Sequence, residues 1–78
     1  MPRYFFDIVD GKDFPDLHGS EWPDLDAARL EAIRYSAEVL RDVPERFWNG
    51  EIWTMMVSDQ HRQLLFTLKF LAETAPPQ

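Results

Sequence analysis

Apolar and polar residues alternate along three stretches of the chain. In residues 3–9, Tyr4, Phe6 and Ile8 fall on one side of an extended chain, and residues 51–58 and 63–70 repeat this period of two. Asp10-Gly11 and residues 59–62 have the composition of turns. The pattern predicts strands at 3–9, 51–58 and 63–70, and residues 20–22 could form a further short edge strand before Pro23.

Between the first and second of these strands the period changes to that of a helix. Asp24 is a good N-cap, and Asp26 in the first turn suits the positive end of the helix dipole. Pro44 disfavours helical geometry at the residue before it, which predicts a helix over residues 24–42. Its apolar stripe consists of Leu25, Ala28, Ala32, Tyr35, Val39 and Leu40, with Ile33 at the edge and Arg29 inside it.

These elements predict an α+β fold in which one amphipathic helix packs on one face of a small antiparallel sheet of three or four strands, ββαββ or βαββ. Residues 1–72 form the single domain and residues 73–78 a flexible tail. If residues 20–22 are a strand, the expected order of the four strands is 2-1-3-4. The helix would cover the face that carries Tyr4, Phe6, Ile8, Trp53, Met55, Val57, Leu64, Phe66 and Leu68.

The stretch FWNGEIW, residues 47–53, places two tryptophans around an Asn-Gly pair, which is a strong signal for a tight hairpin turn. Trp53 shares its alternating face with Met55 and Val57, so we expect it in the core. Trp48 precedes the expected turn and belongs either to the rim of the core or to the exposed surface.

Charge and composition limit the classes of function that the protein could have. The chain has 78 residues, no cysteine and a net charge of −6. Residues 1–26 hold seven acids against two bases, so no basic stripe is available for nucleic acid or for an anionic membrane. No export signal, membrane span or disulfide is expected, which favours a cytoplasmic protein.

Two sets of residues invite a chemical interpretation. His18 and His61 lie in expected loops without a nucleophile, and no catalytic or nucleotide-binding motif occurs in the sequence. The acids around Asp13 are spaced in threes with Pro15 among them, unlike a calcium loop. We therefore expect no enzyme activity, catalytic residue, metal or cofactor. Arg29 is expected to lie along the core edge or to pair with Asp7 or Asp26.

The start MPRYFFDIVDG, the segment DLHGSEWPDLDAARLEA and the closing VSDQHRQLLFTLKF together resemble a family of short alphaproteobacterial proteins, common in rhizobia, that is catalogued only as a domain of unknown function. This resemblance implies a single small bacterial domain and transfers no catalytic residue, substrate or cofactor. The chain departs from the family pattern at Arg62, where a glycine is common, and at Val9, where a polar residue is usual.

The sheet face opposite the helix gives the best functional lead. It carries five large apolar residues, which form the expected interface of a homodimer: Phe5, Val9, Ile52, Met56 and Leu65. Asp7 and Lys69 on the same face could pair across strands or across the dimer, while Phe14 or Trp48 could instead cover the face and leave a monomer. The function expected is therefore a non-catalytic interaction module that self-associates. The alternative is an acidic, antitoxin-like adaptor or nucleic-acid mimic that binds a basic protein partner.

Overall fold

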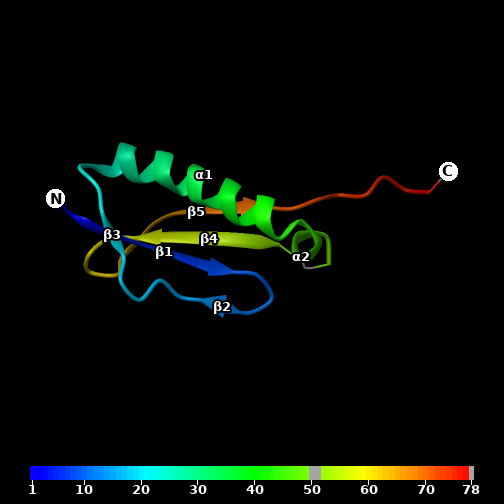
Figure 1. Cartoon of the computed structure of the whole chain (residues 1–78), viewed down its shortest axis with the longest axis horizontal. Coiled ribbons are helices and arrows are strands. Elements are labelled where there is room, and N and C mark those ends of the chain that lie inside the picture. The colour runs from blue at the N-terminus through cyan, green and yellow to red at the C-terminus, as the bar shows by residue number, and fades with distance from the viewer. Residues whose placement is uncertain (50–51, 78) are drawn as a thin grey trace.

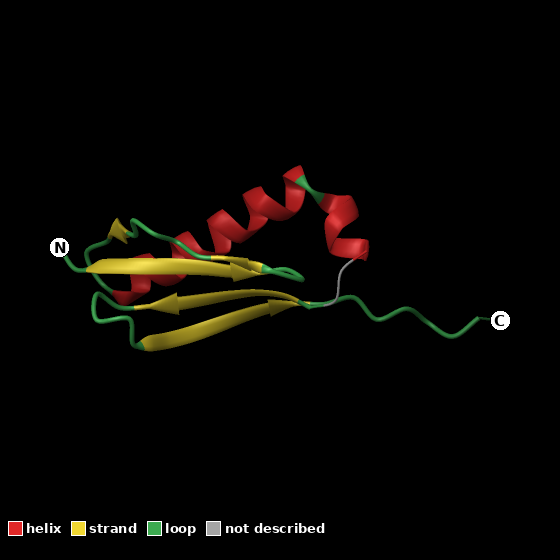
Figure 2. Ribbon diagram, turned by 90° about the horizontal axis from the view of Figure 1, so that it is seen from below, coloured by secondary structure: helices red, strands yellow, loops and turns green. Residues whose placement is uncertain are grey.

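The computed structural model describes residues 1–49 and 52–77, which form two layers (Figures 1 and 2). One layer is an antiparallel sheet, and the other is the long helix α1 (Leu25–Asp42), which crosses one face of that sheet. The strands are β1 (Arg3–Val9), β2 (Asp13–Phe14), β3 (Ser20–Glu21), β4 (Trp53–Ser58) and β5 (Leu64–Phe70), and a short helix α2 (Pro44–Asn49) follows α1. The α+β fold class is confirmed.

Helix α1 begins and ends as its sequence predicts. The Asp24 carboxylate accepts a hydrogen bond from the Ala27 amide at 2.9 Å, which satisfies one of the free N–H groups of the first turn. At the other end the Val43 amide donates to the Val39 carbonyl, and Pro44 follows directly. Arg41 in the last turn suits the negative end of the dipole.

The strand order of the sheet is β2-β1-β4-β5, and β3 pairs with the other end of β1. Residues 3–9, 20–21, 53–58 and 64–70 therefore lie in the 2-1-3-4 order predicted for them, and β2 is an additional strand. All pairings are antiparallel. Both short strands, β2 and β3, pair with the edge of β1 that β4 leaves free.

The core lies between α1 and the strands β1 and β4. Ala28, Ala32 and Ser36 are fully buried at every fourth position of α1, and these small residues let the helix approach β4 closely. The apolar residues buried with them are Tyr4, Phe6, Ile8, Trp53, Met55 and Val57. Trp53 is 1% exposed, so its predicted core position is confirmed. On β5 the residues of the same face, Phe66, Leu68 and Phe70, are only half-buried.

The prediction of a hairpin around Asn49-Gly50 is wrong on its N-terminal side. Residues 44–49 form α2, because proline is favoured at the first position of a helix, where its missing N–H is no loss, and Glu45 follows in the first turn. Gly50 and Glu51, which the prediction also included, lie outside the described residues. Trp48 projects from α2 with 69% of its surface exposed.

The structure corrects one further expectation about a single side chain and decides between two alternatives for another. Leu64 was expected under the helix, but a bulge near the start of β5 pairs it with Ser58, and it is 60% exposed. For Arg29, pairing with Asp26 was one of the predicted alternatives, and it is confirmed: the side chain is mostly exposed, does not lie along the core edge, and pairs with Asp26 at 3.5 Å.

The N-cap makes a direct test of the fold. Replacing Asp24 with alanine should lower the free energy of unfolding by about 1 kcal/mol, because the first turn loses its side-chain acceptor. The melting temperature should fall by about 4–8 °C for a domain of this size. Thermal denaturation followed by circular dichroism measures both. Asp13→Ala is the matched control, since it removes a carboxylate for which the described residues provide no side-chain hydrogen bond or ion pair. Equal losses for the two variants would contradict the cap.

Candidate functional site

The register of the sheet fixes which side chains share the outer face, since cross-strand partners point to the same side. Three rows of residues run across β1, β4 and β5 on the face away from α1: Phe5, Ser58 and Leu64; Asp7, Met56 and Thr67; Val9, Thr54 and Lys69. Apolar and polar side chains therefore mix on this face, and its apolar residues do not form one unbroken stripe.

The five residues predicted as an interface differ in their solvent exposure. Ile52 and Leu65 are 46% and 40% exposed, and Val9 and Met56 are half-buried. Phe5 is half-buried for a different reason, because the guanidinium of Arg62 lies over its ring, with Cζ 3.7 Å from the ring centroid. The structure thus closes one end of the outer face and leaves the rest accessible.

Arg62 is held over Phe5 by the turn before β5. The Asp59 carboxylate accepts hydrogen bonds from the amides of His61 at 2.8 Å and Gln63 at 2.9 Å, which shapes this turn. Arg62 itself takes a left-handed backbone conformation, with φ of 64°, a conformation that side chains other than glycine, asparagine and aspartate rarely adopt. Its guanidinium then pairs with Asp7 at 3.2 Å. The sequence suggested that Asp7 could pair with Lys69, but its partner in the structure is Arg62.

Asp16 connects this cluster to the edge of the sheet. One carboxylate oxygen accepts a hydrogen bond from the Phe6 amide of β1 at 3.1 Å, and the other accepts from the amides of His18 and Gly19. The Asp16 amide donates to Asp7, and its carbonyl accepts from Arg62 at 2.9 Å. A side chain thus replaces a strand partner for the Phe6 amide, between the parts of β1 that pair with β3 and β2.

Gly19 brings the loop backbone close against β1. Its φ is +68°, and a Cβ placed on it would lie 2.8 Å from the Tyr4 carbonyl oxygen and 3.0 Å from the Phe5 ring. Glycine is required here both for the backbone conformation and for the space. The cluster of Phe5, Asp7, Asp16, Gly19 and Arg62 is therefore a packed unit, called the edge clasp below.

Sequence reasoning missed the edge clasp, although it noticed one member. The departure from glycine at Arg62 was taken as a question about the turn type, whereas the side chain at that position is what covers Phe5. Asp16 had no distinguishing signal, because a carboxylate that caps a strand edge looks like ordinary loop composition in a sequence.

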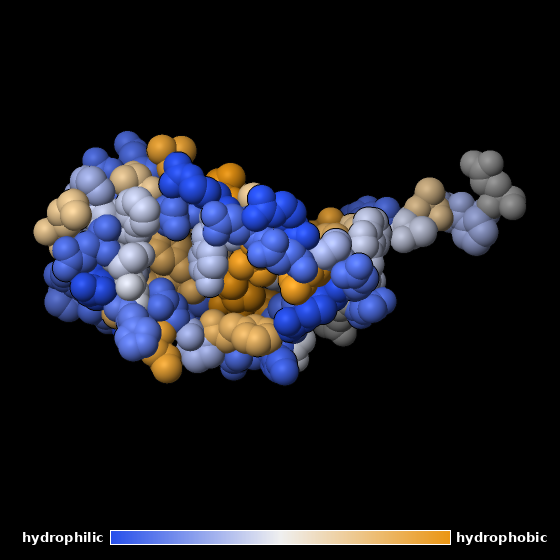
Figure 3. All heavy atoms as spheres, viewed as in Figure 1, coloured by the Kyte–Doolittle hydropathy of each residue, from blue (hydrophilic) through white to orange (hydrophobic). Residues whose placement is uncertain are grey.

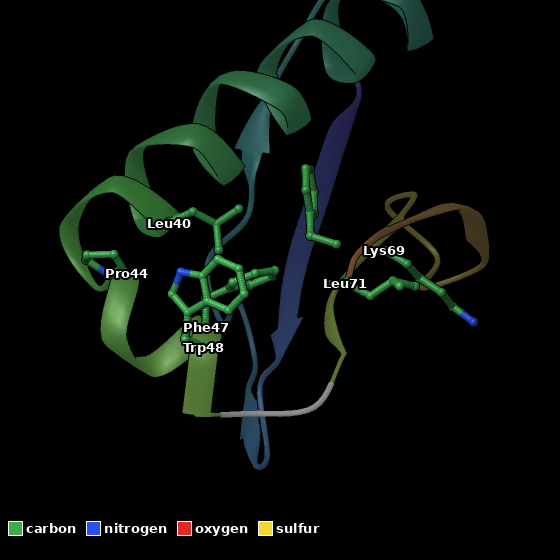
Figure 4. Close-up of a pocket in the computed structure, with 7 residues that line it drawn as sticks. Leu40, Pro44, Phe47, Trp48, Lys69 and Leu71 are labelled. Carbon is green, nitrogen blue, oxygen red and sulfur yellow. The ribbon is translucent and has the colours of Figure 1, made fainter. Parts of the chain in front are cut away.

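A pocket of about 470 Å³ opens at the far end of the sheet, beyond the last turn of α1 (Figure 4). Its lining comes from α1, α2 and the end of β5: Leu40, Pro44, Phe47, Trp48, Lys69, Phe70 and Leu71. The rings of Phe47 and Trp48 pack edge to face, with their centroids 5.7 Å apart. Six of the seven lining residues have mainly apolar side chains, and the ammonium of the seventh, Lys69, points away from Trp48 and Leu40 (Figure 4). Trp48 belongs to this pocket, not to a lid over the outer face.

A smaller hollow lies between α1 and β2, where apolar side chains gather on the face seen in Figure 3. Phe14 pairs with Ile8, which is buried under the helix, so Phe14 does not serve as a lid for the outer face. Arg46 of α2 lies over the Phe14 ring and pairs at 3.6 Å with Asp10, whose side chain is 8% exposed. This ion pair ties α2 to the turn after β1.

Tyr35 lines the same hollow. Burial raises the pKa of its hydroxyl above the usual value of 10, and the carboxylates of Asp16 and Glu38 add to the shift. The tyrosine is therefore neutral at physiological pH and acts here as a wall of the hollow with a polar tip.

The histidines and acids of the loops do not assemble into a reactive group. His18 and His61 are both exposed, and the described residues contain no cluster of three histidine, cysteine or acidic side chains that could hold a metal ion. Across the same residues no helix has the length and apolarity needed to cross a bilayer.

The fold defines a small two-layer α+β domain whose openings are an outer sheet face and an apolar end pocket. The model of one family, a domain of unknown function (DUF6894), matches residues 3–71, and the chain belongs to that family. Neither a curated protein nor a solved structure is found to match it. The family match covers every helix and strand of the structure.

The edge clasp predicts a difference between two glycines. Gly11 and Gly19 both have positive φ, but a Cβ on Gly11 would meet nothing within 4 Å. Gly11→Ala should therefore cost only the backbone strain, about 1 kcal/mol. Gly19→Ala adds a clash with backbone and should cost on the order of 2–3 kcal/mol. Urea denaturation of both variants measures the two costs, and equal values would show that the loop does not pack on Phe5.

Proposed function

We propose that the protein is a non-catalytic, cytoplasmic interaction module that forms a homodimer through the outer face of its sheet. The observation that carries the proposal is a sheet face, with Met56 in its middle row, that no helix of the described residues covers. Leu65 of β5 and Ile52, the residue before β4, are 40% and 46% exposed. Full burial of a large apolar side chain is worth about 1.5–3 kcal/mol. A two-fold interface would recover part of this for both copies at once.

The edge clasp narrows the region available to such an interface. Phe5 is occupied by Arg62, so the contact would centre on Met56 and extend toward Val9, Ile52 and Leu65. The polar residues of the outer rows, Thr54 and Thr67, would supply hydrogen bonds between the copies. This mixture of apolar and polar groups is ordinary for an interface that is not obligate.

The acidic alternative has less support, because the acids of residues 1–26 are largely used inside the chain. Arg62 pairs with Asp7, Arg46 with Asp10, Arg3 with Glu21 and Arg29 with Asp26. Asp16 accepts three amide hydrogen bonds and Asp24 caps α1. Of the seven, Asp13 alone makes no side-chain hydrogen bond or ion pair with the described residues, so a basic partner would have to compete with contacts that the other six already make.

The homodimer is tested by placing a charge in the middle of the outer face. Met56→Lys should shift the mass measured by light scattering at micromolar concentration toward a folded monomer of 9.2 kDa, because an interface that buries an unpaired ammonium is strongly disfavoured. Circular dichroism checks that the variant folds.

Leu30→Lys is the matched control for this experiment. Leu30 is an exposed apolar residue of α1, and α1 lies on the other side of the sheet, so this variant should leave the mass unchanged. A wild-type protein that scatters as a monomer throughout the same concentration range would end the proposal. A pull-down at low and high salt addresses the alternative, since a basic partner released by salt would favour the acidic adaptor.

A further inference from the structure

The two edges of the sheet differ in how far their backbone groups are paired. On β1 the free edge is paired by β3 at Arg3 and Tyr4, by β2 at Ile8 and Val9, and by the Asp16 carboxylate at Phe6. On β5 the free edge runs for seven residues with no partner strand among the described residues (Figure 2). Unpaired N–H and C=O groups in a row are a template for another strand.

The apolar cover also stops short of this edge. Tyr4, Phe6 and Ile8 of β1 are buried beneath α1, whereas Phe66, Leu68 and Phe70 of β5 are half-buried on the same face. A helix with its side chains is about 10–12 Å across, and strands lie about 4.8 Å apart. One helix therefore covers about two strands, and those two are β1 and β4.

The flank of α1 that borders the uncovered strip is apolar as well. Leu40 faces β5, because it shares the end pocket with Phe70. Ile33 lies two turns earlier on the same side of the helix and is mostly exposed. A strand added to β5 could hydrogen-bond to its unpaired backbone groups and could contact apolar side chains on the helix side. Recognition by strand addition uses this arrangement.

We propose that the edge of β5 pairs antiparallel with β5 of a second copy, about a two-fold axis that passes through Thr67. An unpaired strand edge specifies a strand as its occupant, and the chain supplies one of matching chemistry in β5 itself. This inference is independent of the outer-face homodimer, because edge and face are different surfaces of the sheet.

The register about Thr67 is the one that the β5 sequence suits. Phe66 would face Leu68 of the second copy on the helix side, so two copies would cover the strip that neither α1 reaches. Thr67 would face its own counterpart, a favourable pair across antiparallel strands. Lys69, the one charged residue of β5, would face Leu65 and not another lysine. A register centred on Lys69 would oppose two like charges and is disfavoured.

Single cysteines test this register directly, because the chain has no cysteine of its own. In an antiparallel pair about the axis, the two Cα atoms at position 67 lie about 4.5–5.5 Å apart, within the range of about 4.4–6.8 Å that a disulfide needs. At position 69 the two copies are separated by about 13 Å along the strands. Both side chains are exposed, so Thr67→Cys and Lys69→Cys are matched in access.

Under mild oxidation, Thr67→Cys should form a covalent dimer many times faster than Lys69→Cys. A mixture of Leu65→Cys and Lys69→Cys should form mainly the mixed disulfide. Adding Leu68→Lys to Thr67→Cys should abolish the fast cross-link, because it places a charge in the helix-side strip, while adding Met56→Lys should leave it intact. Equal rates for Thr67→Cys and Lys69→Cys, or a fast cross-link that survives Leu68→Lys, would overturn the edge pairing whatever the outcome for the outer face.

Discussion

The packing of α1 on β4 is the contact on which the rest of the structure depends. Ala28, Ala32 and Ser36 present a line of small, fully buried residues, and the large residues Trp53 and Met55 fill the space they leave. In a chain of 78 residues, this is nearly all the core that one helix can provide. Because the helix is only about two strands wide, everything beyond β1 and β4 has to be covered by other means.

On the β1 side the chain supplies that cover itself. The segment from Asp10 to Glu21 returns along β1 as two short strands joined by the Asp16 contact, and the edge clasp seals the adjoining corner of the outer face. Trp22 continues this pairing, since its amide donates to the Pro2 carbonyl at 3.1 Å. Most carboxylates of the N-terminal third accept hydrogen bonds or pair with arginines within the fold, so the acidic residues of this segment have structural partners.

The sequence predicted the main elements because their signals are local. Alternation over residues 3–9 and 64–70, the Asp24 cap and Pro44 each act over a few residues. The errors arose where a local signal competed with another or where the answer was long-range. Pro44 starts α2 as well as ending α1, and this overrode the hairpin signal of Asn49. The clasp joins positions 7, 16 and 62, and no spacing in the sequence reveals such a contact.

The candidate surfaces were predictable in part for the same reason. Alternation placed Phe5, Val9 and Met56 on the outer face, and the register of β1 with β4 is consistent with that face, with one of the three residues in each row. The open strip along β5 was not foreseen, because alternation says which side chains face the helix but not how many strands the helix covers. Leu68 and Val57 occupy equivalent positions in the alternating pattern of their strands. Val57 is buried and Leu68 is only half-buried, because the helix is not wide enough to cover β5.

The central claim is that the chain seals one edge of its sheet and leaves the other open, and amide hydrogen exchange measured by NMR in dilute solution tests it most directly. The Phe6 amide, bound to Asp16, should be protected about as well as the amides that join β1 to β4. Alternate amides of β5 should exchange far faster and should gain protection as the protein concentration rises. Fast exchange at Phe6, or uniform protection along β5 at every concentration, would contradict the account.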